Sequence, residues 1–158
     1  MKTKFLFPNK FKTLGWILFI PSIIITVIIS LFNINTDDYL NVKVFAILSD
    51  FPLSKPEHFL FIKNSIVDEL LLIGLVCGGI LVGFSKLKIE DEFTTKIRYE
   101  SLVWAIYLNY ALILLFTIFV YGMGYMQVLI HNVFTTLLFF ILRFHYMIYK
   151  QNKSLQDD

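Results

Sequence analysis

The stretch SKLKIEDEFTTKIRYES, residues 85–101, carries eight charged side chains between two strongly apolar runs. The whole chain has 14 Lys and Arg and 12 Asp and Glu among its 158 residues, so this segment holds about a third of the charge. Charged side chains are costly inside a bilayer and inexpensive in water. We therefore expect residues 85–101 to be an aqueous linker between two membrane-spanning helices.

The composition of the whole chain indicates a membrane protein. Apolar residues make up 57% of it and aromatic residues 17%, and the mean hydropathy is +0.70. A soluble domain of this length buries only about 70% of its unfolded surface, which is too little to hide so many apolar side chains. The net charge of +2, without a basic cluster, argues against a nucleic-acid partner.

Four apolar runs approach the roughly 20 residues needed to cross a bilayer core of about 30 Å. They cover residues 14–32, 62–84, 102–122 and 126–149. Backbone groups in hydrocarbon must bond within their own segment, so all four runs are predicted to be helices. The expected fold class is an all-α membrane protein, a four-transmembrane-helix bundle that forms a single domain over residues 1–158. The first run is too long for a signal peptide and lacks a small-residue cleavage site, so we expect it to remain as an anchor.

The distribution of basic residues predicts the orientation. Four Lys precede the first span, four basic residues lie in the linker 85–101, and three lie near the C-terminus. Only three of the 14 lie elsewhere, between residues 43 and 63. Because basic residues accumulate on the cytoplasmic side, we expect both termini and the linker in the cytoplasm and the loop 33–61 outside.

The linker also has an apolar stripe. Ile89, Phe93 and Ile97 recur every four residues, which predicts an amphipathic helix that starts near Glu90 and continues into the third span. This stripe either packs on the bundle or on lipid headgroups, or it forms a docking face for a cytoplasmic protein.

The EDEFTTKIRYES run that leads into LVWAIYLNY is similar to a signature of small four-span inner-membrane proteins of Bacteroidota. Members of this group have no assigned function, and some are encoded beside helix-turn-helix regulators. The resemblance covers the second half of the chain and the four-span layout. It implies a bacterial cytoplasmic (inner) membrane and a regulatory or accessory role, and it implies no catalytic residues.

The loop 33–61 is long enough to form a small exterior element. Residues 39–48 alternate in a strand-like pattern and predict either a β-strand, which would need a partner for its edges, or an interfacial segment. The SKPE sequence that follows places Ser54 three residues before Glu57, as in a helix N-terminal capping box. We expect a helix to begin there and to continue directly into the second span.

The second span carries small residues at helical spacing. Gly74, Gly78, Gly79 and Gly83 form two Gly-x3-Gly pairs, which allow helix backbones to approach closely. The stripe is therefore a candidate helix-packing face, either inside the bundle or between copies of the chain.

Polar side chains at the outer ends of two spans form a candidate pocket. They are Asp68 and Glu69 on the second span and Gln127, His131 and Asn132 on the fourth. Polar groups are expensive to bury in lipid, so we expect them to face the bundle or water. The cluster either holds the helices together by hydrogen bonds or forms a ligand or proton site in which a carboxylate pairs with His131.

The remaining residues offer little chemistry. The only cysteine is Cys77, so there is no disulfide framework. His131 and His145 are spaced like haem ligands on a helix, but the only further histidine is His58, in the loop. We expect no catalytic residues, no metal and no cofactor.

The expected function is a non-enzymatic accessory, regulatory or interaction subunit. Its expected partners are a second copy of the chain or a membrane or cytoplasmic protein. The alternatives are a small oligomeric transporter or channel using Asp68, Glu69, His131 and Asn109, and, more remotely, a haem-binding or other membrane enzyme.

Overall fold

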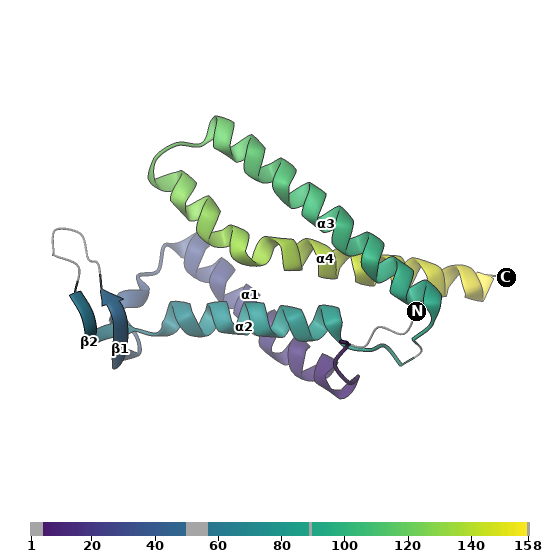
Figure 1. The fold of residues 1–158 in the computed structure, drawn as a ribbon, viewed down its shortest axis with the longest axis horizontal. Coiled ribbons are helices and arrows are strands. Elements are labelled where there is room, and N and C mark those ends of the chain that lie inside the picture. The colour runs from purple at the N-terminus through teal and green to yellow at the C-terminus, as the bar shows by residue number, and fades with distance from the viewer. Residues whose placement is uncertain (1–4, 50–56, 89, 158) are drawn as a thin grey trace. The chain divides into compact units, whose positions relative to one another are not determined.

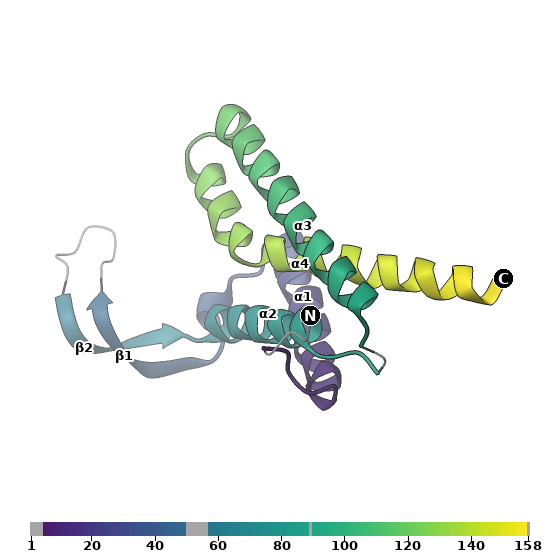
Figure 2. The same cartoon turned by 45° about the vertical axis from the view of Figure 1, so that its right-hand side comes forward.

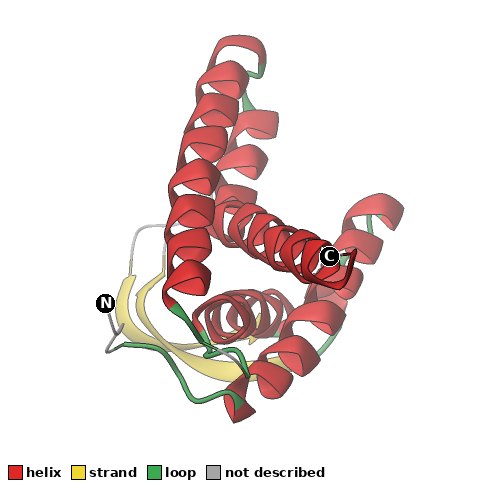
Figure 3. Ribbon diagram, turned by 90° about the vertical axis from the view of Figure 1, so that its right-hand side faces the viewer, coloured by secondary structure: helices red, strands yellow, loops and turns green. Residues whose placement is uncertain are grey.

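The computed structural model describes residues 5–49, 57–88 and 90–157. Its elements follow the order α1 (Lys10–Phe32), η1 (Thr36–Asp38), β1 (Asn41–Ser49), β2 (Glu57–Ser65), α2 (Val67–Phe84), α3 (Glu92–Phe119) and α4 (Met123–Asp157) (Figure 1). The four α-helices are long and apolar enough to cross a membrane, α4 as far as Lys153. This confirms a mostly helical chain with four membrane-length helices. Figure 3 shows that the strand pair is the only sheet in the described ranges.

The chain divides into two compact units. The first, the helical unit, comprises Met1–Ile20 and Gly74–Asp158, and the second, the hairpin unit, comprises Pro21–Ile73. The boundary in α1 coincides with Pro21, which lies inside the helix. A proline there removes one intrahelical hydrogen bond and commonly bends the helix.

The helical unit has a small apolar core. Phe140, Phe144, Leu75, Ile141 and Val82 have almost no exposed surface. The ring of Phe140 lies 5.2 Å from that of Phe84 and 5.9 Å from that of Phe144, measured between centroids. Most other large apolar side chains of the helices are exposed, as expected for side chains that a bilayer solvates.

Helices α3 and α4 form an antiparallel pair joined by a short turn (Figure 2). Gly122 has φ +68° in this turn, a left-handed conformation that glycine adopts without strain. Helix α3 begins at Glu92, and Asp91 caps it by accepting a 2.7 Å hydrogen bond from the Thr94 backbone N–H. The predicted unbroken helix from near Glu90 into the third span is therefore confirmed.

The hairpin unit contains a two-stranded antiparallel sheet. β1 pairs with β2 from Asn41 opposite Ser65 to Ser49 opposite Glu57. Of the two possibilities for residues 39–48, the structure shows the strand, and its partner is the neighbouring segment of the same chain. A backbone hydrogen bond from Ile66 N–H to the Leu40 carbonyl, 3.4 Å long, closes the base of the hairpin.

The predicted helix from Ser54 into the second span is wrong. Ser54 lies outside the described residues, but Glu57–Ser65 is strand β2, and α2 begins only at Val67 rather than at residue 62. The capping pattern is a local signal, whereas residues 57–65 can satisfy their backbone groups by pairing with β1. The Ser65 hydroxyl donates to the Thr36 carbonyl at 2.9 Å and so holds the junction between β2 and α2.

Candidate functional site

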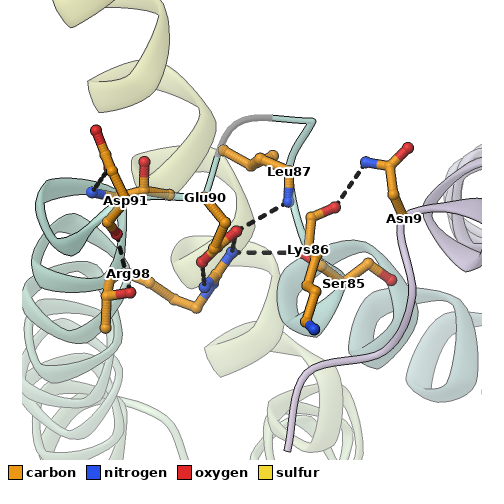
Figure 4. A network of polar contacts seen from close by, with 9 residues as sticks. Asn9, Ser85, Lys86, Leu87, Glu90, Asp91 and Arg98 are labelled. Carbon is orange, nitrogen blue, oxygen red and sulfur yellow. Dashed lines mark hydrogen bonds and ion pairs between the residues drawn. The ribbon is translucent and has the colours of Figure 1, made fainter. Parts of the chain in front are cut away.

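A network of polar contacts surrounds Arg98 in the linker 85–101. Arg98 is only 5% exposed, although it stands in the charged stretch that the sequence places in water. Its guanidinium donates two hydrogen bonds to the Glu90 carboxylate and a third, 3.3 Å long, to the Ser85 carbonyl (Figure 4). The guanidinium carbon also lies 4.9 Å from the centre of the Phe144 ring, within the range of a cation–π contact.

Neighbouring segments attach to the same network. The second carboxylate oxygen of Glu90 accepts a 2.9 Å hydrogen bond from the Leu87 N–H. The Asn9 side chain donates to the Lys86 carbonyl at 2.7 Å (Figure 4). The Phe7 N–H donates to the Phe84 carbonyl, and the Lys86 N–H donates back to the Phe7 carbonyl, each over 2.9 Å. The segment before α1 and the start of α3 are thereby both tied to the end of α2.

Asp91 completes this region by capping α3. Its carboxylate accepts hydrogen bonds from the side chain and the backbone N–H of Thr94, and these bonds hold the pKa of Asp91 below its usual value. A negative charge at this position also complements the positive end of the helix dipole.

The predicted docking face does not form one exposed stripe. Ile97 is only 4% exposed and belongs to the core of the helical unit, whereas Phe93 is half exposed. Ile89 lies outside the described residues. Sequence reasoning missed Arg98, because spacing alone does not distinguish a basic residue in water from one held by a carboxylate and an aromatic ring.

The small residues of α2 contact α1 and α4 within the helical unit. A Cβ atom on Gly78 would lie 2.8 Å from the Phe19 nitrogen, and one on Gly83 would lie 2.5 Å from the Phe140 ring. The nearest atom to a Cβ on Gly79 would belong to Phe19, at 3.2 Å. Gly74 is buried as well. The close approaches of Gly78, Gly79 and Gly83 therefore lie inside one copy of the chain.

Asp68 and Glu69 lie in the first turn of α2 and have partners in the hairpin unit. The Thr36 hydroxyl donates to Asp68 at 3.3 Å, and the Asn64 side chain donates to Glu69 at 3.2 Å. Acidic residues are also favourable at a helix N-terminus. The predicted pairing of one of these carboxylates with His131 stays a prediction.

The other three predicted pocket residues line one cleft between α3 and α4, about 340 Å³ in volume. Its polar lining consists of Asn109, Gln127, His131, Asn132 and Thr135. The side chains of Asn109 and Asn132 bond reciprocally, with N–O distances of 3.0 and 3.4 Å. Asn109 is 3% exposed, so this pair joins the two helices at a buried point.

The histidines of α4 are each engaged by the helix backbone. His131 Nδ1 lies 2.7 Å from the Gln127 carbonyl oxygen, and His145 Nδ1 lies 2.9 Å from the Ile141 carbonyl oxygen. The ring of His145 also contacts those of Trp16 and Phe144. Within the described ranges, no three His, Cys, Asp or Glu side chains form a group that could hold a metal ion.

The hairpin presents an aromatic face. The ring of Phe45 lies 5.4 Å from that of Phe61 and 6.4 Å from that of Phe59, between centroids. These three side chains are 55%, 74% and 71% exposed, respectively. Lys43 lies directly opposite Lys63, one strand period from the Phe45–Phe61 pair and on the same face. We call these five residues the hairpin face.

No model of a known protein family matches the chain, and comparison with curated proteins and with solved structures also finds no match.

Proposed function

We propose that the protein is a non-enzymatic accessory or regulatory subunit of a bacterial cytoplasmic membrane, and that its hairpin face binds an acidic surface of another protein outside the membrane. The observation that carries this proposal is the hairpin face itself. An isolated two-stranded sheet is only marginally stable in water. Three exposed phenylalanines on such a sheet form the kind of apolar patch that is typical of interaction sites.

Two further features support a partner on this face. Lys43 and Lys63 are like charges placed directly opposite each other, an arrangement that destabilises an antiparallel sheet unless an anion lies nearby. Phe59 has φ +55°, which is strained for a bulky side chain. An acidic partner would relieve the lysine repulsion and cover the aromatic rings. The similarity of residues 90–101 to the Bacteroidota four-span proteins agrees with an accessory role.

The first test uses site-specific photo-crosslinking in the cells that naturally contain the protein. With a benzophenone amino acid at Phe61, we expect an adduct whose mass corresponds to a different polypeptide. The double variant Lys43→Glu, Lys63→Glu should reduce its yield about tenfold, the effect of roughly 1.4 kcal/mol of binding free energy. The charge variant Lys150→Glu and a benzophenone at Phe119, on α3, serve as controls. An adduct of twice the chain mass, or a yield unaffected by the lysine substitutions, would contradict the proposed partner.

The proposed orientation places both termini and residues 85–101 in the cytoplasm and the hairpin outside. In a Cys77→Ser background, an impermeant maleimide added to spheroplasts should modify Lys43→Cys. It should modify Lys96→Cys only after the membrane is opened. Both positions are exposed, so accessibility within the protein does not limit either reaction. Labelling of Lys96→Cys in sealed spheroplasts would reverse the orientation.

A further inference from the structure

The cleft between α3 and α4 is lined by both polar and apolar side chains, which we call its polar wall and its apolar wall. The polar wall contains Gln127 and His131, beside the reciprocally bonded asparagine pair. The apolar wall consists of Leu112, Ile113, Phe116 and Val128. A volume of about 340 Å³ lies within the range of small-molecule sites. The cleft shares no residue with the hairpin face or with the network around Arg98.

The polar side chains of the cleft lie well inside a membrane-length helix, where polar groups are uncommon. His131 lies eight residues after Met123, the first residue of α4, which corresponds to about 12 Å along the helix axis. Gln127 and His131 are both exposed on this membrane-length helix. Polar side chains at such depth normally face a protein partner or a polar cavity, because hydrocarbon cannot bond to them.

The hydrogen bonds already present decide which groups remain for a ligand. A carbonyl oxygen only accepts, so the contact between His131 Nδ1 and the Gln127 carbonyl places the proton on Nδ1. In the neutral ring Nε2 is then an acceptor. The Gln127 side-chain amide adds one donor group and one acceptor. The Thr135 hydroxyl donates to the His131 carbonyl and can still accept.

These groups fit a hydroxyl better than an anion. None of the residues that line the cleft is a lysine, an arginine or a carboxylate. A phosphate or a carboxylate would therefore enter without a compensating charge, at a large desolvation cost. A hydroxyl group can donate to Nε2 of His131 and accept from the Gln127 amide at once. Its hydrocarbon part would contact the apolar wall.

We propose that the cleft binds the hydroxyl end of an uncharged amphiphilic lipid of the monoacylglycerol or diacylglycerol type. Such a ligand satisfies the exposed polar groups of α4 and enters from the surrounding hydrocarbon. The binding site rests on the α3–α4 pair alone and does not depend on the function proposed for the hairpin.

The test uses the purified full-length protein in phosphatidylcholine nanodiscs and a monoacylglycerol with a diazirine in its acyl chain. Ultraviolet light should attach the probe to peptides covering residues 109–116 and 124–135, and unlabelled diacylglycerol should compete. His131→Phe should reduce labelling about three- to tenfold, as expected for one lost hydrogen bond. His131→Gln, which retains an acceptor, should restore most of it. Val128→Trp should abolish labelling by filling the cleft. His58→Phe, in the hairpin, is the matched control and should have no effect.

A fatty acid with the same acyl chain and diazirine is the second probe, at a pH where its carboxylate is ionised. We expect at least a tenfold weaker labelling of the cleft. Equal labelling by both probes, undiminished labelling of His131→Phe, or labelling spread evenly over all four helices would overturn the proposal. A crosslink joining two copies of the chain through α3 and α4 would overturn it as well, because a second copy would then occupy the cleft.

Discussion

Arg98→Met should lower the free energy of unfolding by about 3 kcal/mol, the cost of breaking a buried ion pair by removing one partner. Methionine occupies a similar volume but cannot replace the hydrogen bonds to Glu90 and Ser85 or the contact with Phe144. The side chain of Glu90, 20% exposed, would keep its charge after losing its ion-pair partner. Unfolding in mixed micelles with increasing dodecyl sulfate measures the change.

Two further variants separate the ion pair from general damage to the helix. Arg98→Met combined with Glu90→Gln should recover about 1–2 kcal/mol relative to Arg98→Met, because the carboxylate charge is gone. The glutamine oxygen can still accept from the Leu87 N–H. Lys96→Met removes the exposed pair with Glu100, 3.9 Å apart, and should change stability by less than about 0.5 kcal/mol. Equal effects of Arg98→Met and Lys96→Met would show that Arg98 is not held as the structure describes.

Gly78→Ala should destabilise the protein by about 1–3 kcal/mol, although alanine is the better helix former. The added methyl group would lie 2.8 Å from the Phe19 nitrogen and 3.1 Å from the Gly15 carbonyl oxygen. Both atoms belong to the backbone of α1, so the helices themselves must separate. Gly78→Leu should reduce stability more strongly in the same unfolding measurement.

Gly124→Ala is the matched control for this prediction. A methyl group there would meet only the Val120 side chain, at 3.4 Å. We expect no loss of stability and at most a small gain from the helix propensity of alanine. If Gly78→Ala matched Gly124→Ala in stability, the close approach of α1 and α2 at Gly78 would not exist in the membrane.

The predictions that succeeded depend on short stretches of sequence. The four membrane-length helices follow from apolar runs, and the helix that starts near Glu90 follows from the recurrence of apolar residues at positions 89, 93 and 97. The alternation of residues 39–48 allowed a strand or an interfacial segment, and the structure shows strand β1 at residues 41–49. Each of these predictions used only the order of neighbouring residues in the sequence. The predicted helix from Ser54 was wrong because a local capping pattern cannot reveal that β1 is available as a pairing partner.

The candidate sites also contain features that neighbouring residues predict and features that only the folded chain reveals. Gln127, His131 and Asn132, which the sequence places within six residues of one span, line the same cleft. Sequence spacing did not reveal Asn109 as the partner of Asn132, because the two lie 23 residues apart on different helices.

The sequence by itself determined the number of apolar helices, their order and the distribution of charge along the chain, because these properties depend on composition and local periodicity. Only the tertiary structure decided that Arg98 is buried against Glu90 and Phe144, that Gly78 meets Phe19, and that residues 57–65 form a strand. The physical reason is that a side chain's burial, and the choice between helix and strand for a short segment, depend on groups distant in sequence. Those groups become neighbours only when the chain folds.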